Sequence, residues 1–162
     1  MDQEGEEVAM GAFNLADLIL RQNDGDLIKA EKLARESLLI SANDHRIGRS
    51  CMLLGRILMI QDKDKDGDET KELFERSLAI YLENEGPDGP NTAVGNISIA
   101  QLNYKQAMIQ SVISIKRKQL LIAKSYAEEA IRIETKIHNP THQNYILAAS
   151  ALSDILRELS II

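Results

Sequence analysis

The sequence TKELFERSLAI at residues 70–80 decides the fold, because AEKLARESLLI at 30–40 and AKSYAEEAIRI at 123–133 repeat its pattern. In each segment the first, fifth and eighth residues are small or of moderate size, and the ninth and eleventh are Leu or Ile. Offsets of four, three and one place these residues on one face of a helix. The sequence therefore predicts three related helices, each with one face packed against a neighbour.

A second pattern precedes each of these segments and recurs once more near the end of the chain. It consists of a large aliphatic residue, a small residue, any residue and a second aliphatic residue, at 15–18, 54–57, 99–102 and 152–155. The small residue lets another helix approach closely. We therefore predict three helix pairs and one unpaired helix, around a core of Leu15, Leu18, Leu38, Leu54, Ile57, Phe74, Leu78, Ile99, Leu102, Ala127, Ile131, Leu152 and Ile155.

Corners separate the predicted pairs, with the sequences SANDHR at 41–46, GPDGPN at 86–91 and HNPTHQ at 138–143. Pro90 is a favourable first residue for a helix. Residues 96–139 contain neither Gly nor Pro, so we place the bend of the third pair near Ser111 to Ser114; one long helix through Lys116 to Lys118 is the alternative. His138 and His142 have no Cys or acidic residue directly beside them, which favours a corner role over a zinc site.

Composition excludes several classes of function. A formal net charge of −6 argues against bulk attraction to nucleic acid or anionic lipid. The lone cysteine, Cys51, lies among Met and Leu residues, where a thiol usually behaves as a small buried apolar group. No apolar stretch is long enough to span a bilayer. We expect a cytoplasmic protein without a cofactor.

The segments SLAIYLENEGPDGPNTA at 77–93 and NISIAQLNY at 96–104 resemble the tetratricopeptide repeats of kinesin light chains, and a weaker resemblance extends over about residues 8–160. The resemblance implies an all-α solenoid, a right-handed superhelix of antiparallel helix pairs, whose first helices line a concave groove. It implies a scaffold or adaptor that binds a peptide segment of a partner protein, and no catalysis.

The resemblance also implies which side chains face the groove: Asn14, Asp17, Arg21, Arg49, Arg56, Ser98, Gln101 and Lys105. The family's paired asparagines match only in part here, because the second repeat has Met52 and Leu53 instead. Arg49 and Arg56 are therefore the stronger candidates for holding a carboxylate of a peptide, which suits an acidic partner. The alternative is that both are ordinary solvated arginines.

An acidic segment, DKDKDGDETKEL at 62–73, supports a second hypothesis of a calcium-responsive helical protein. Asp62, Asp64, Asp66 and Gly67 match the first, third, fifth and sixth positions of an EF-hand loop, and Asp68 and Glu72 complete the candidate ligands. The twelfth position, however, is Leu73 where the loop needs Glu. No glycine-rich phosphate loop or paired catalytic carboxylate occurs in the sequence, so we expect no enzymatic activity.

We expect an acidic tail at residues 1–7 and a repeat domain of about three and a half helix pairs at 8–162. Between Gly89 and Ala127 the chain has basic residues and no acidic ones, which could meet an acidic partner. The chain stops after an unpaired helix. Three interpretations remain: it is a fragment of a longer array, this helix caps the stack, or its apolar face supports self-association.

Overall fold

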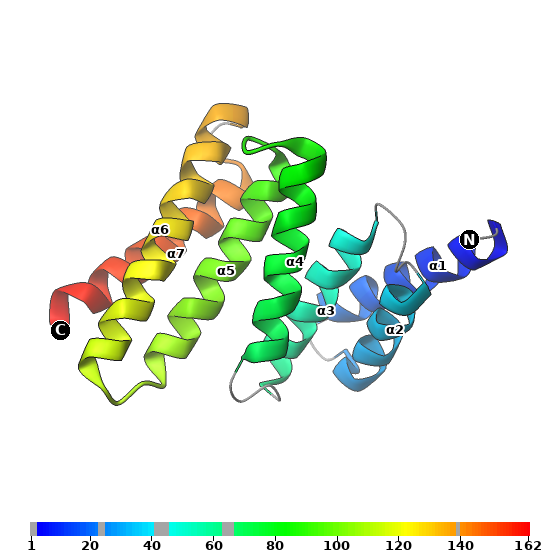
Figure 1. Cartoon of the computed structure of the whole chain (residues 1–162), viewed down its shortest axis with the longest axis horizontal. Helices are drawn as coiled ribbons and strands as arrows, with labels where there is room; N and C mark the ends of the chain where they lie inside the picture. The colour runs from blue at the N-terminus through cyan, green and yellow to red at the C-terminus, as the bar shows by residue number, and fades with distance from the viewer. Residues whose placement is uncertain (1–2, 23–24, 41–45, 63–66, 139) are drawn as a thin grey trace. The chain divides into compact units, whose positions relative to one another are not determined.

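The computed structural model describes residues 3–22, 25–40, 46–62, 67–138 and 140–162 of the chain (Figure 1). These residues form helices and the segments that join them, with no strand among them, so the predicted all-α class is confirmed. The helices are α1 (Gln3–Arg21), α2 (Leu27–Ile40), α3 (Ile47–Gln61), α4 (Asp68–Glu85), α5 (Pro90–Met108), α6 (Ile113–Ile137) and α7 (Gln143–Ile161). Within the described ranges, no helix is both long and apolar enough to cross a membrane.

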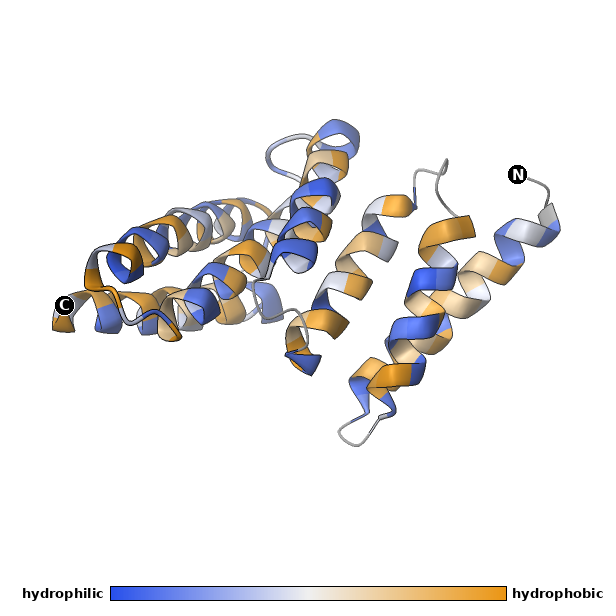
Figure 2. Cartoon of the chain, turned by 60° about the horizontal axis from the view of Figure 1, so that its bottom comes forward, coloured by the Kyte–Doolittle hydropathy of each residue, from blue (hydrophilic) through white to orange (hydrophobic). Residues whose placement is uncertain are grey.

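The chain divides into two compact units, Met1–Ile80 and Tyr81–Ile162, which we describe separately. In the first unit α1 contacts α2 and α3, and α2 contacts α3. In the second unit α5, α6 and α7 contact one another in the same way. Figure 2 shows that hydrophobic and hydrophilic stretches alternate along the helices, as expected where one side of each helix packs on a neighbour.

The first, fifth and eighth residues of the three repeated segments are buried, as the sequence predicts. Each side chain is at most 1% exposed, at Ala30, Ala34, Ser37, Thr70, Phe74, Ser77, Ala123, Ala127 and Ala130. Ser77 also donates a hydrogen bond to the carbonyl of Gly48 at 2.7 Å, which joins α4 to α3. The repeated pattern therefore marks the buried side of each of these helices.

The close approach expected at the small residues occurs at Gly55 of α3. A β-carbon built there would lie 2.6 Å from Cε1 of Phe74, which belongs to α4 and is fully buried. Its neighbours Leu54 and Ile57 are at most 1% exposed. Only a glycine lets the Phe74 ring lie against the α3 backbone in this way.

The predicted core of the first helix is wrong. Leu15 is 41% exposed and Leu18 is 54% exposed, whereas Ala9, Ala12, Ala16 and Ile19 are buried. These four residues recur at offsets of three and four, so they form the side of α1 that packs in the core. The predicted acidic tail also differs, because residues 3–7 are part of α1, where Glu4 and Glu6 favour the helix start electrostatically.

The bend of the third pair lies at residues 109–112, between α5 and α6, which confirms its predicted place and excludes one continuous helix.

The corner before α5 also has the turn residues that the sequence predicts. Gly86 ends α4 with a φ of 77°, Gly89 precedes α5, and Pro90 is its first residue. The hydroxyl of Thr92 donates to the carbonyl of Gly86 at 2.9 Å and closes this turn.

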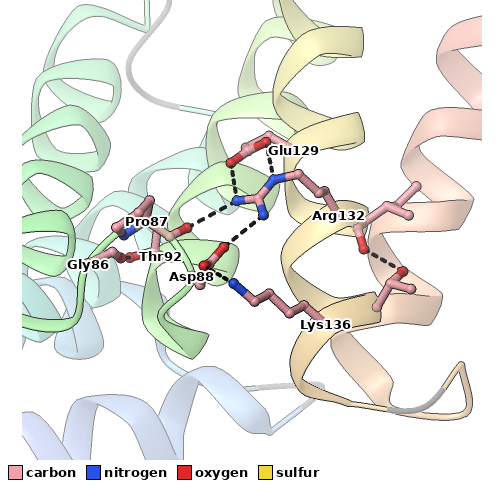
Figure 3. Close-up of polar contacts among 9 residues, drawn as sticks. Gly86, Pro87, Asp88, Thr92, Glu129, Arg132 and Lys136 are labelled. Atoms are coloured by element: carbon pink, nitrogen blue, oxygen red, sulfur yellow. Dashed lines mark hydrogen bonds and ion pairs between the residues drawn. The ribbon is translucent and has the colours of Figure 1, made fainter.

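Ion pairs join that corner to α6 (Figure 3). Nη1 of Arg132 lies 2.7 Å from Oδ1 of Asp88, Arg132 also pairs with Glu129 at 2.7 Å, and Lys136 bonds Oδ2 of Asp88. The hydrogen bonds from Lys136 and Arg132 hold the pKa of Asp88 below its ordinary value. Arg132 lowers the pKa of Glu129 in the same way.

Candidate functional site

A small hollow lies between α1 and α3 in the first unit. Its volume is about 60 Å³, and it is lined by Met10, Phe13, Asn14, Arg46, Arg49 and Ser50. Ligand pockets for small molecules have volumes of about 300–1,000 Å³, so this hollow suits one side chain at most. Asn14 and Arg49, two of the predicted groove residues, therefore share one surface.

Arg49 lies with its guanidinium over the ring of Phe13, 4.8 Å from the ring centroid. This cation–π contact favours one position of the charged group, and a guanidinium over a ring keeps its N–H donors available for a ligand. Arg46, on the same rim, pairs with Glu6 at 3.3 Å. No carboxylate partner of Arg49 occurs among the described residues, so its positive charge is exposed beside the hollow.

Arg56 lies seven residues after Arg49 on α3, two helical turns or about 10 Å away. It is exposed, and within the described part of the chain it has no hydrogen-bond or ion-pair partner. The two arginines thus place two positive charges along one side of α3. This spacing fits two acidic residues of an extended peptide.

The other predicted groove residues of α1 are paired with each other. Nε of Arg21 lies 2.8 Å from Oδ2 of Asp17, one helical turn earlier. A pair of this kind at the surface contributes little stability, but it neutralises both charges. Asp17 and Arg21 therefore contribute less net charge to this surface than the two arginines of α3.

The predicted residues of α5 are not all at the surface. Ser98 is only 5% exposed and donates a hydrogen bond to the carbonyl of Val94 at 3.0 Å, so its expected place in a groove is wrong. The cause is the packing of α5 against both α6 and α7, which buries more than one side of the helix. Lys105 is half-buried.

Gln101, in contrast, lines a second hollow of about 240 Å³ between α5 and α7. The hollow is also lined by Tyr104, Leu147, Ser150, Ala151 and Asp154. Asp154 pairs with Arg157 at 3.0 Å. At least one hollow in the described part of each unit is therefore lined by a residue that the resemblance implies.

The calcium hypothesis is not tested by the described residues. Asp64 and Asp66 lie outside them, and so does His45 of the first corner. Asp62 follows α3, with a φ of 55°, while Asp68 begins α4 and Glu72 lies one turn further along that helix. All three carboxylates belong to exposed residues.

Cys51 is fully buried, as expected, and its burial raises the pKa of the thiol. The basic stretch of the second unit is partly used inside the fold, because Lys116 pairs with Glu158 of α7 at 3.0 Å. Arg117 donates to the carbonyl oxygen of Ile162 at 3.3 Å. Both contacts join α6 to the last turn of α7 or the residue after it.

A cluster that sequence reasoning missed lies where α6 meets α7. Glu134 is fully buried, and its Oε2 lies 3.0 Å from Nδ1 of His138 and 2.9 Å from Nδ1 of His142. An acidic residue therefore lies beside the histidine pair, so the prediction that none is close to it is wrong, although both histidines do lie at the corner between α6 and α7. The spacing of four residues between Glu134, in the last turn of α6, and His138, which directly follows that helix, was the available signal.

Comparison with known proteins adds no family assignment: no protein-family model and no curated protein sequence matches this chain.

Proposed function

We propose that this chain binds an acidic peptide segment of a partner protein along α1 and α3, and that it works as a scaffold or adaptor without catalysing a reaction. The observation that carries this proposal is the hollow lined by Asn14 and Arg49, with Arg56, which has no ion-pair partner among the described residues, two turns further along α3. The helix pairs and the resemblance of their sequences support a tetratricopeptide-like solenoid in the cytoplasm as the setting.

The chemistry of the surface defines the ligand. The hollow has an apolar wall from Met10 and Phe13, which would take one aliphatic or aromatic side chain. Arg49 would take a carboxylate at the hollow, and Arg56 a second one two turns further along α3. The Asn14 amide both donates and accepts hydrogen bonds, as a peptide backbone requires. The ligand we propose therefore combines one apolar residue with two or more acidic ones.

A peptide library displayed on phage tests the proposal. Selection against the wild-type chain should enrich peptides that contain Asp or Glu near an apolar residue. For a selected peptide, Arg49→Ala and Arg56→Ala should each weaken binding about ten- to a hundredfold, because a hydrogen bond to a charged group contributes about 1.5–3 kcal/mol. Added salt should weaken the same interaction.

Arg76→Ala is the matched control, since Arg76 is an exposed arginine of the same unit on α4. It should leave the affinity unchanged. If peptides without acidic residues are selected, or if the Arg76 variant loses as much affinity as the other two, the binding surface lies elsewhere. Equal helicity of all variants by circular dichroism is required before the affinities are compared.

A further inference from the structure

Glu134, His138 and His142 converge where α6 ends and α7 begins. Figure 1 shows this end of α6 near the top of the view. Glu134 is in the last turn of α6, His138 directly follows that helix, and His142 directly precedes α7. The two imidazole rings stack with their centroids 3.7 Å apart and an angle of 9° between their planes. Three groups that can bind a metal ion thus come from one short segment of chain.

The buried carboxylate of Glu134 is only half satisfied. Its Oε2 contacts both imidazoles, but its Oε1 has no hydrogen-bond partner among the described residues. A buried ionised carboxylate without a full set of partners is costly. A cation bound to this carboxylate would offset that cost.

The distances fit a shared metal ion. Potential ligand atoms of the three residues all lie within 4.8 Å of one another, and the oxygen–nitrogen distances are 3.0 and 2.9 Å. Two donors on one zinc ion, with bond lengths of about 2.0–2.2 Å, are separated by about 3 Å when the angle at the metal is near a right angle. The oxygen–nitrogen pairs therefore already have a separation that suits one ion. The donor atoms farthest apart, up to 4.8 Å, must move closer together, and the stacked imidazole rings must turn so that both nitrogens face the ion.

The donor types select the kind of ion. Two imidazole nitrogens and one carboxylate oxygen suit zinc and similar divalent transition metals, whereas calcium and magnesium prefer oxygen ligands only. The side chains of His138 and His142 are 33% and 38% exposed, so an ion can reach the cluster from solvent. Positions left open by three protein ligands would hold water or a donor from another molecule.

We propose that Glu134, His138 and His142 form a binding site for one divalent transition-metal ion of the zinc type, which fastens the end of α6 to the start of α7. This site is separate from the proposed peptide surface and does not depend on it. Because the ligands come together only in the folded chain, the ion stabilises the fold by mass action.

The experiment uses the full chain, freed of metal with a chelator and titrated with Zn²⁺ in a calorimeter, with melting temperature followed in parallel. We expect one ion per chain and a melting temperature that rises with Zn²⁺ concentration. Replacing Zn²⁺ with Co²⁺ should give the visible absorption of a nitrogen-ligated cobalt ion, and Mg²⁺ should give no effect.

Variants then assign the site. Glu134→Gln, His138→Asn and His142→Asn should each weaken Zn²⁺ binding by at least about tenfold, since even residues that only orient a metal ligand contribute 10–100-fold. Glu128→Gln, an exposed glutamate of α6, and His45→Asn, the remaining histidine of the sequence, should bind as the wild type does. Helicity in the absence of metal shows whether each variant is folded.

His142→Asn keeps the test decisive if Glu134→Gln fails to fold, because His142 is partly exposed and lies outside the helix. Absence of Zn²⁺ binding to the folded wild-type chain would overturn the proposal, and so would undiminished binding by a folded His142→Asn variant. In either case the three side chains form a metal-free corner in which imidazole N–H groups donate to the carboxylate.

Discussion

Replacing Gly55 with alanine tests the packing of α3 against α4 directly. An alanine β-carbon would lie 2.6 Å from Cε1 and 2.8 Å from Cδ1 of Phe74, well inside the 3.4 Å at which ordinary contact begins. The Phe74 side chain is fully buried, so its ring cannot turn out into solvent. Overpacking of this kind costs about 1–3 kcal/mol.

The opposing effect is the helix propensity of alanine, which favours it over glycine by about 1 kcal/mol inside a helix. Gly11→Ala isolates this gain, because Gly11 is exposed in α1 and a β-carbon there meets nothing within 4 Å. We expect Gly11→Ala to stabilise the chain by up to about 1 kcal/mol. Gly55→Ala should then be less stable than Gly11→Ala by about 1–3 kcal/mol, the overpacking cost alone.

Urea unfolding followed by circular dichroism measures both free energies, provided that the slopes against urea agree among the variants. Phe74→Leu, combined with Gly55→Ala, completes a double-mutant cycle, since leucine lacks the ring carbon closest to position 55. Gly55→Ala should lower the free energy of unfolding by less in the Phe74→Leu variant than in the wild type. Strictly additive effects, or a Gly55→Ala variant as stable as Gly11→Ala, would show that the ring does not lie against the α3 backbone.

Three further predictions concern single side chains. Burial raises the pKa of the Cys51 thiol, so thiol reagents should modify it slowly in the native chain and rapidly in urea. Lys136 and Arg132 lower the pKa of Asp88, so the stability that this carboxylate adds is present above its ordinary value of 3.8 and is lost as pH falls through the lower folded-state value. The melting temperatures of wild type and Asp88→Asn should therefore differ near neutral pH and converge in acid. Ser77→Ala removes a buried hydrogen bond to an α3 carbonyl, and urea unfolding should show a loss of about 1 kcal/mol.

The parts of the fold that sequence predicts are those set by local periodicity and chain geometry. The small positions of the repeated segments are buried, and the α5–α6 bend lies where it was expected. Gly55 follows the same logic, because a glycine between two aliphatic residues of a helix indicates a close neighbour. These features depend on residues near one another in sequence, so the pattern alone is sufficient.

The errors come from packing that hydrophobicity alone does not reveal. In α1 the sequence offers both leucines and alanines, and close helix contact selects Ala12 and Ala16 rather than Leu15 and Leu18. Ser98 is buried because two helices cover α5. Such choices depend on how near a neighbouring backbone approaches.

For the candidate surfaces too, local sequence patterns predict some features, and the three-dimensional course of the chain decides the others. Asn14 of α1 and Arg49 of α3 line one hollow, and both were named from the sequence. The Glu134 cluster was missed because His142 returns to Glu134 only after the chain reverses around Pro140. Helical spacing could link Glu134 to His138, but the second histidine required the three-dimensional course of the corner.

Because each helix packs on its near neighbours in sequence, parts of the chain can fold while it is being synthesised. In the second unit, α5 and α6 are joined by residues 109–112 alone, and α7 then adds to that pair. Closing so short a loop costs little entropy, and topologies dominated by such local contacts fold in about microseconds to milliseconds. Protein synthesis proceeds at about 5–20 residues per second, far more slowly. The α5–α6 hairpin can therefore assemble on the ribosome before α7 has emerged, which leaves α7 to dock on a surface already formed.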